Sequence, residues 1–465
     1  MERHDVIIIG AGPAGLFAAI ELAESGLDVL VIEKGPDLKR RRCPALDFKR
    51  VCLKCPVCPL ISGFGGAGAF SDGKITLSHE VGGNLKKYIE NDSFRELMKY
   101  VDSRLLEFGA PHRLFGTNDD AIKRIKYEAQ KNGLVFIPTP IRHLGTDGGF
   151  RVLEKMRNYV DRLGIQIHFN EKAEDILARD GEVYGVRTQK NEYHSSYVIV
   201  APGRAGATWM AAQAKKLHLE TYPNPVDIGV RVEIPASIMD NLTSVVYEPK
   251  LIYYSKKFDD RIRTFCVNPN GVVVQEYAED VITVNGFSNT YPVSENTNFA
   301  LLVSTSFTEP FNDPITFGRS IVKLANLISG GVLLQRLGDL MRGRRSTEKR
   351  ILKNPVQPTL ESAIPGDISF ILPYRYLVNL IEMIEALDRL APGVASPYTL
   401  LYGVEVKFYS NRIKVNKSLE TEIKGLFAAG DGAGITRGLL HSAISGLVAA
   451  REIKNRMGIK NESKV

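Results

Sequence analysis

The sequence predicts an α/β fold in which a parallel-sheet domain, built from separate stretches of chain, carries an inserted, mixed and mainly antiparallel α+β domain. Three observations predict it. A complete β-α-β pattern opens the chain, a strand, glycine-rich turn and helix close it, and short alternating segments typical of antiparallel strands lie between them. We expect the parallel-sheet domain at 1–80, 140–222 and 420–465, a helical excursion at 81–139, and the inserted domain at 223–419.

Composition and charge narrow the class of protein. The 465 residues are 44% hydrophobic and 24% charged, which is ordinary for a globular protein of one to three domains. Met1 leads straight into a strand and no apolar run approaches the ~20 residues that span a bilayer, so we expect a cytoplasmic protein without membrane contact. The net charge of +7 allows an acidic partner or RNA, but a solvated surface is the favoured interpretation, also for the basic run from Lys39 to Arg42.

The β-α-β pattern at the start has the spacing of a dinucleotide-binding motif. A short strand is followed by Gly10, Gly12 and Gly15 in the order G-x-G-x-x-G, and then by a helix from Pro13. Gly10 permits the tight turn, Gly12 lets a pyrophosphate approach the backbone, and Gly15 allows helix and strand to pack closely. The unpaired N–H groups at the helix N-terminus favour phosphate binding.

A carboxylate ends the second strand of this unit. Glu33 follows the strand at 27–32, where an acidic side chain accepts hydrogen bonds from the hydroxyls of an adenosine ribose. Its negative charge argues against a 2′-phosphate at the same place. Lys34, the next residue, is also expected at the cofactor.

A second glycine-rich turn lies near the C-terminus. The segment 425–434 runs from a buried-strand pattern into Gly430 and Asp431, and a helix follows at about 439–457. Asp431 can accept hydrogen bonds from ribityl hydroxyls, and the helix N-terminus suits the N1–C2 carbonyl edge of a flavin, where the reduced ring carries negative charge. A dehydrogenase that binds only NAD needs no such second loop, so the two motifs together predict non-covalently bound FAD.

Together with the strand at 198–203, these motifs resemble the Rossmann-like FAD-binding fold of the glutathione-reductase-like FAD/NAD(P)-binding superfamily. The segments 63–74, 143–147, 229–233 and 430–438 resemble more specifically the poorly characterised "FAD-dependent dehydrogenase" family of prokaryotes. The resemblance covers most of the chain. It implies FAD and the fold, and it supplies no substrate.

The residues expected at the cofactor come from the two motifs, the strand end near 201 and the loop 63–74. That loop has five glycines, so its backbone can lie flat against the isoalloxazine ring. The expected residues are Gly10, Gly12, Pro13, Ala14, Gly15, Glu33, Lys34, Gly65, Gly66, Ala67, Gly68, Ala201, Gly203, Gly430, Asp431 and Gly438.

The sequence fixes no catalytic residue and offers only weak candidates. A group that donates a proton near the flavin is needed for most reductions. Lys74 can also stabilise negative charge at N1 and O2 of a reduced flavin. The candidates are Ser71, Asp72, Lys74, His79 and His441, with His143 a further histidine of this kind.

Four cysteines, Cys43, Cys52, Cys55 and Cys58, precede the glycine-rich loop. The last three have the C-x-x-C-x-x-C spacing of a ferredoxin cluster, and Cys43 can supply a fourth thiolate. Structural zinc more often uses two separated C-x-x-C pairs. The spacing therefore favours a [4Fe–4S] cluster over zinc, a redox-active dithiol or a set of reduced thiols.

The expected function is that of an FAD-dependent oxidoreductase, a reductase or dehydrogenase of a small molecule. We find no second G-x-G-x-x-G unit between 223 and 420, so NAD(P)H is expected only as a transient donor and a ferredoxin-like donor acting through the cluster is favoured. One alternative is a flavin-dependent RNA-modifying enzyme, which needs a basic face at the flavin cleft. The other is an electron-transfer flavoprotein with a protein partner and no substrate-sized cavity.

Overall fold

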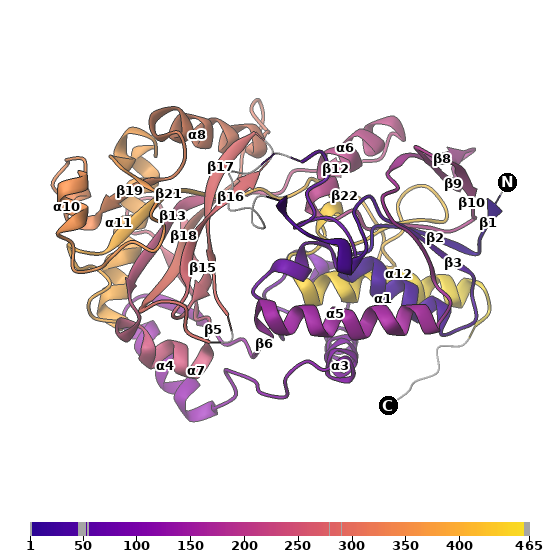
Figure 1. Ribbon diagram of the computed structural model, residues 1–465, viewed down its shortest axis with the longest axis horizontal. Coiled ribbons are helices and arrows are strands. Elements are labelled where there is room, and N and C mark those ends of the chain that lie inside the picture. Colours follow the sequence, from indigo (N-terminus) through magenta and orange to yellow (C-terminus); the bar gives the residue numbers. More distant parts are fainter. Residues whose placement is uncertain (1, 45–52, 54, 279, 290, 460–465) are drawn as a thin grey trace. The chain divides into compact units, whose positions relative to one another are not determined.

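The computed structural model describes residues 2–44, 53, 55–278, 280–289 and 291–459. The chain forms two compact units. The first unit consists of Met1–His112, Arg142–Asn224 and Tyr409–Val465, and the second unit of Arg113–Ile141 and Pro225–Phe408. The predicted α/β fold with a parallel Rossmann-like sheet and a large, mainly antiparallel sheet is confirmed (Figure 1).

A five-stranded parallel sheet forms the centre of the first unit, in the order β23-β11-β2-β3-β7. Four of its strands are short, entirely buried runs of apolar residues, as is typical of a parallel sheet covered on both faces. The strands are β2 (Val6–Ile9), β3 (Val29–Ile32), β7 (Gln166–His168), β11 (Val198–Val200) and β23 (Leu426–Ala428).

Helices α1 (Pro13–Ala23) and α12 (Leu439–Arg456) pack side by side in this unit (Figure 1). Both follow directly on a strand and a glycine-rich turn, so their N-termini lie at the carboxyl ends of β2 and β23. The other helices of the unit are α3 (Asn91–Glu107), α5 (Gly145–Arg162) and α6 (Ala207–Lys216).

Smaller sheets complete the first unit. A four-stranded sheet has the order β1-β10-β9-β8, and β12 pairs with β22. Strand β4 (Lys74–Thr76) pairs with β6 (Ile141–His143), which brings the end of the loop 63–74 next to His143. The remaining bounds are β1 (Glu2–Arg3), β8 (Ala173–Arg179), β9 (Glu182–Thr188), β10 (Glu192–His194), β12 (Thr221–Tyr222) and β22 (Arg412–Ile413).

An eight-stranded sheet forms the second unit, in the order β20-β19-β21-β13-β18-β15-β14-β5, and only the β19–β20 pair is parallel. A separate hairpin joins β16 (Val272–Ala278) and β17 (Val281–Phe287). The strands of the large sheet are β5 (Leu134–Ile137), β13 (Val226–Pro235), β14 (Lys250–Tyr254), β15 (Arg261–Asn268), β18 (Asn296–Thr305), β19 (Leu333–Arg336), β20 (Ile364–Pro365) and β21 (Leu400–Lys407). The helices are α4 (Asp119–Lys131), α7 (Asp240–Val246), α8 (Pro314–Ser329), α9 (Leu337–Leu340), α10 (Glu348–Leu352) and α11 (Tyr374–Leu390).

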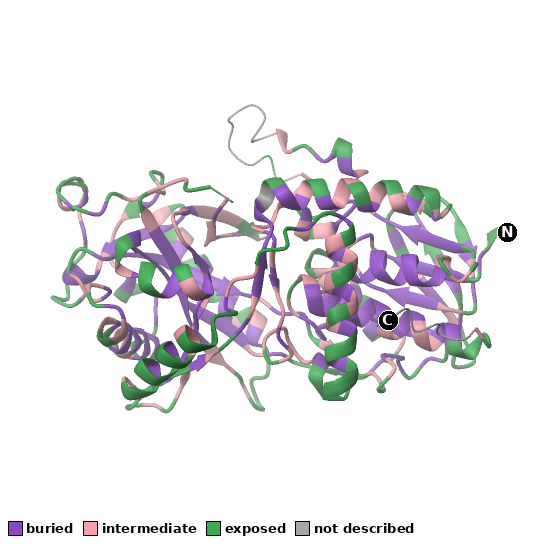
Figure 2. Ribbon diagram, turned by 90° about the horizontal axis from the view of Figure 1, so that it is seen from below, coloured by how far each residue is buried: buried purple, intermediate pink, exposed green. Residues whose placement is uncertain are grey.

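Residues 81–139, expected as one helical excursion, are divided between the units. Helix α3 belongs to the first unit, and α4 with β5 belongs to the second. In both units the buried residues gather in the strands and on the inner sides of the helices, and exposed residues line the outer sides (Figure 2). No helix in the described part of the chain is long and apolar enough to cross a membrane.

Strand β13 buries both of its faces, although its sequence alternates like a strand with one solvated face. Ile228, Val230, Val232 and Ile234 belong to the hydrophobic core of the second unit. The residues between them are buried as well. Arg231 donates to both carboxylate oxygens of Glu405, at 2.7 and 2.8 Å. The charged face is therefore held together by ion pairs inside the protein.

Candidate cofactor site

Three glycine-rich segments meet in the first unit: 10–15, 63–68 and 430–438. The backbone N–H of Gly65 donates to the carbonyl of Ala11 at 2.8 Å, and a Cβ on Gly66 would lie 3.1 Å from Cα of Gly12. A Cβ on Gly430 would lie 3.3 Å from that of Ala14. The structure thus brings the two sequence motifs and the loop 63–68 to the N-terminus of α1.

The glycines of the first motif differ in how much space surrounds them. A Cβ on Gly15 would lie 1.9 Å from the carbonyl oxygen of Gly10, and one on Gly10 would lie 2.3 Å from that of Ala201. Both positions are therefore closed by packing inside the protein. A Cβ on Gly12 would meet only Cα of Gly66, at 3.9 Å, so the space above the start of α1 is open. No side chain caps the N-terminus of α1.

Glu33 connects the segments around this space. Its two carboxylate oxygens accept hydrogen bonds from the backbone N–H groups of Ala11, Gly35 and Gly63, at 2.8 to 2.9 Å. A carboxylate has about four acceptor positions, so one remains for a ribose hydroxyl. The neighbouring Lys34 is directed elsewhere and donates to the carbonyl of Ala205 at 3.0 Å. Burial lowers the pKa of Lys34, and the charge of Glu33 opposes that effect.

Asp431 shapes the turn before α12. Its carboxylate accepts from the hydroxyls of Thr436 at 2.7 Å and Ser442 at 3.2 Å, and from the backbone N–H of Gly438 at 3.3 Å. Gly203 lies against the same turn, because a Cβ on Gly432 would be 2.4 Å from its carbonyl oxygen. The predicted residues of this region are therefore neighbours in space, and the turn that carries them is held by side chains of α12.

Two of the catalytic candidates form an ion pair and have a histidine beside them. Lys74 Nζ lies 2.7 Å from Asp72 Oδ2, and both side chains are largely buried. Burial, and after it the charge of Lys74, lowers the pKa of His143 from 6.5 to about 4. His143 is therefore neutral near pH 7. Ser71 donates its hydroxyl to the carbonyl of Gly68 at 2.9 Å, which closes the loop.

The other two histidine candidates differ in exposure. His441 is 2% exposed. Its Nε2 lies 2.8 Å from the carbonyl oxygen of Ser78, and its ring centroid lies 4.9 Å from that of Phe94. Burial lowers the pKa of His441. His79 is more open and pairs with Glu80 at 2.9 Å. The first turn of α12 thus directs His441 into the interior.

The cysteine prediction falls partly on residues that the structure describes. Cys43, Cys55 and Cys58 carry no disulfide, whereas Cys52 lies outside the described residues. In the described ranges no three His, Cys, Asp or Glu side chains are placed to hold a metal ion. The choice among a cluster, zinc, a dithiol and free thiols therefore stays a prediction.

Arg41 is a site residue that the sequence did not reveal. It lies in the basic run expected to be solvated, yet it is 4% exposed. Its guanidinium donates to the carbonyl oxygens of Pro59 and Leu60, and to those of Phe64 and Gly66 in the glycine-rich loop, at 2.6 to 2.9 Å. Its charge is therefore held by carbonyl oxygens, one of them on Gly66, the residue nearest Gly12. Burial lowers the pKa of Arg41 to about 10.

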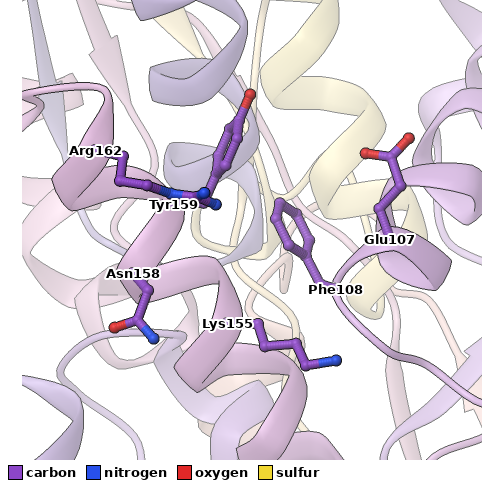
Figure 3. A pocket seen from close by; sticks show the side chains of 6 residues that line it. All are labelled: Glu107, Phe108, Lys155, Asn158, Tyr159 and Arg162. Atoms are coloured by element: carbon purple, nitrogen blue, oxygen red, sulfur yellow. The ribbon is translucent and has the colours of Figure 1, made fainter.

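A surface hollow elsewhere in the first unit contains none of the predicted residues. It lies between the C-terminal parts of α3 and α5 and has a volume of about 570 Å³ (Figure 3). Its lining residues are Glu107, Phe108, Lys155, Asn158, Tyr159 and Arg162.

Comparison with known proteins gives a family match for a segment of each unit. Residues 5–40 match the family described as "FAD binding domain", and residues 225–408 match "FAD-dependent protein, C-terminal domain-like". An uncharacterized protein of Clostridium beijerinckii is 29% identical over 474 residues, covering 96% of this chain and 80% of the relative. A digeranylgeranylglycerophospholipid reductase of Methanosarcina mazei matches over 53 residues at 47% identity, covering 11% of this chain and 13% of that protein.

Solved structures resemble the chain loosely over its length. An L-proline dehydrogenase from P. horikoshii has a TM-score of 0.45 at 13% identity, with 99% of this chain and 96% of that chain covered. A 3-ketosteroid dehydrogenase from Rhodococcus jostii has a TM-score of 0.46 at 13% identity, with 97% of each chain covered. The substrates of such distant proteins say nothing about the substrate of this one. The two family matches and the long alignment with the clostridial protein show that the chain is similar to FAD-dependent proteins over both of its parts.

Proposed function

We propose that the chain is an oxidoreductase that uses FAD to oxidise or reduce a small organic molecule. The observation that carries the proposal is the meeting of the three glycine-rich segments around the N-terminus of α1 in the first unit. An open space above Gly12, uncapped N–H groups and the buried charge of Arg41 all suit a pyrophosphate. FAD supplies two-electron chemistry with organic substrates and one-electron chemistry with redox partners.

Individual side chains take the other roles at the cofactor. Glu33 has an acceptor position left for a ribose hydroxyl, and Asp431 holds the turn that positions the N-terminus of α12 for the pyrimidine edge of the flavin. Within the loop 63–74, Lys74 holds its charge against Asp72. His143 is neutral near pH 7 and can accept or donate a hydrogen bond there.

A [4Fe–4S] cluster held by Cys43, Cys52, Cys55 and Cys58 is part of the proposal. The C-x-x-C-x-x-C spacing supports it, and so does the closeness of the segment to the glycine-rich loop, since Arg41 binds both Pro59 and Gly66. The cluster would take single electrons from a ferredoxin-like donor. Structural zinc is the alternative ligand for the same thiolates.

Purification without oxygen, followed by quantification of FAD, iron and zinc, tests both parts. We expect one FAD per chain, and iron with a broad absorbance shoulder near ~400 nm. A chain without FAD overturns the proposed function. FAD without iron overturns the cluster alone, and zinc in its place makes the cysteines structural.

The Gly12→Ala variant tests where the pyrophosphate binds. Gly12 has extended backbone that alanine adopts, and its Cβ would have space, so the variant is expected to fold normally. A methyl group that overfills a packed site costs about 1–3 kcal/mol, so FAD affinity should fall by about 5- to 150-fold. Unchanged FAD affinity in the folded variant would place the pyrophosphate elsewhere.

A further inference from the structure

Arg437 carries a positive charge that no carboxylate neutralises within the described residues. Its guanidinium lies over the ring of Tyr409, with Cζ 3.3 Å from the ring centroid. No Asp or Glu oxygen of the described chain comes within 4.0 Å of it. The nearby carboxylate of Asp431 is engaged with Thr436, Ser442 and the backbone of Gly438.

Two other stacked arginines of the first unit differ from Arg437 in having a carboxylate partner. Arg104 lies over Phe108 and Tyr159 and also pairs with Glu24 at 2.7 Å. Arg456 lies over Phe427 and also binds both carboxylate oxygens of Glu420. In those cases the ring and the carboxylate together complete the environment of the guanidinium. At Arg437 the ring is present and the carboxylate is not.

The backbone around Arg437 is firmly positioned. Its N–H donates to the carbonyl of Gly82 at 2.7 Å, and the preceding residue, Thr436, bridges to Gly83. Gly434 packs directly on the loop between β21 and β22 that carries Tyr409, since a Cβ there would lie 2.6 Å from the carbonyl oxygen of Ser410. Tyr409 itself is buried. The cation is therefore held in one place, one residue before Gly438 at the start of α12.

A guanidinium that stacks on a ring still has its five N–H donors in its own plane, pointing outward from the stack. That edge matches a carboxylate, which binds an arginine through two parallel hydrogen bonds. The proposed function places the flavin at the N-terminus of α12, whose N-cap Gly438 directly follows Arg437. Because no described carboxylate pairs with it, this guanidinium can bind the carboxylate of a substrate held near that helix start.

We propose that Arg437, stacked on Tyr409, binds a carboxylate group of the substrate, so that the enzyme acts on a small carboxylic acid. This inference rests on the proposed function, because it places the flavin at the start of α12. It goes further by naming the substrate class and the residue that recognises it. Tyr409 acts as a positioning residue, which fixes the plane in which the arginine presents its donors.

The test uses the FAD-loaded protein and three small monocarboxylates, acetate, pyruvate and benzoate, as probes. Binding is followed by the change in the visible absorbance of the flavin at constant ionic strength, with benzamide as a neutral analogue of benzoate. We expect saturable binding of at least one carboxylate and none of benzamide. If none of the three perturbs the flavin of the FAD-loaded wild type, the inference is overturned. FAD content is measured first, so a chain without FAD registers separately as failure of the proposed function.

Variants then assign the binding to Arg437. Hydrogen bonds to a charged group are strong enough that Arg437→Gln should weaken carboxylate binding about 10- to 100-fold. Arg437→Lys keeps the charge but loses the two parallel hydrogen bonds. Its affinity for the carboxylate should therefore lie between those of wild type and Arg437→Gln. Arg179→Gln is the matched control. Arg179 also lies over a tyrosine, Tyr184, but its side chain is 83% exposed, and the change should leave binding intact.

Two outcomes would overturn the assignment. One is Arg437→Gln binding the carboxylate as tightly as wild type. The other is a lowered reduction potential of the flavin in Arg437→Gln with carboxylate affinity unchanged, which would mean that the cation serves the flavin ring. If Arg437→Gln does not retain FAD, the comparison between wild type and Arg437→Lys decides, and equal affinity of these two counts against the inference.

Discussion

The contact between α1 and α12 can be tested by one methyl group. A Cβ on Gly446, in the middle of α12, would lie 2.0 Å from the carbonyl oxygen of Ala14 in α1. Restoring the ordinary contact distance of 3.4 Å needs a shift of about 1.4 Å between two backbones. Overpacking of this kind costs about 1–3 kcal/mol, and the higher helix propensity of alanine returns at most about 1 kcal/mol.

Gly446→Ala is therefore expected to lower the free energy of unfolding by about 1–2 kcal/mol. FAD should bind more weakly too, because Ala14 also contacts Gly430 and the shift separates the two cofactor loops. Urea unfolding followed by circular dichroism measures the first effect, and flavin fluorescence after gel filtration measures the second.

Gly149→Ala in α5 is the matched control. A Cβ there would meet no atom within 4 Å, so only the gain in helix propensity remains. The control should be more stable than wild type by about 1 kcal/mol or less and should retain its FAD. If Gly446→Ala behaves like Gly149→Ala in both assays, the close approach of the two helices is not what positions the loops.

Four further predictions follow from side chains with several partners. Glu33→Gln replaces an oxygen that accepts backbone N–H groups by a donor, which should cost about 1–3 kcal/mol of stability and release FAD, as measured by urea unfolding and flavin content. Arg41→Lys cannot reach all four carbonyls, so FAD affinity should fall by about tenfold or more in a fluorescence titration, and an unchanged affinity would contradict the role of Arg41. The folded-state pKa of His143 is depressed, so its contribution to stability is complete above pH 6.5 and is lost as the pH falls to about 4. The free energy of unfolding of wild type, measured with urea, should therefore drop relative to that of His143→Gln over that pH range, by up to about 3 kcal/mol, and parallel pH profiles of the two proteins would refute the prediction. Arg231→Met leaves the buried Glu405 without its main partner and should cost about 3–5 kcal/mol. Arg375→Met, which breaks the more exposed pair with Asp260, should cost about 1 kcal/mol or less, and urea unfolding of both variants measures the difference.

The parts of the fold that local patterns determine could be predicted from the sequence. The glycine spacing after β2 and β23 and the apolar runs before it define a strand, a turn and a helix without reference to distant residues. The family matches agree with the cofactor that these two motifs predict.

The parts that depend on distant partners could not be predicted. The sequence places Arg41 in a basic run that is expected to be solvated. Its burial is explained by carbonyl oxygens of residues 59–66, which accept hydrogen bonds from its guanidinium. Strand β13 reads as having a solvated face, because its ion-pair partner Glu405 lies 174 residues further along the chain. The pairing of β4 with β6, which places His143 beside Lys74, is likewise absent from any local pattern.

The order of strands in the first unit has a consequence for how the protein is made. Strand β11 lies between β2 and β23, so the sheet that starts at Val6 lacks an edge until Leu426–Ala428 have been synthesised. The second unit needs nothing beyond Phe408. Domains usually fold on the ribosome from the N-terminus onward. The second unit, in the middle of the chain, can therefore finish folding first. The first unit cannot complete its sheet, and we expect it to bind FAD only after α12 has left the ribosome.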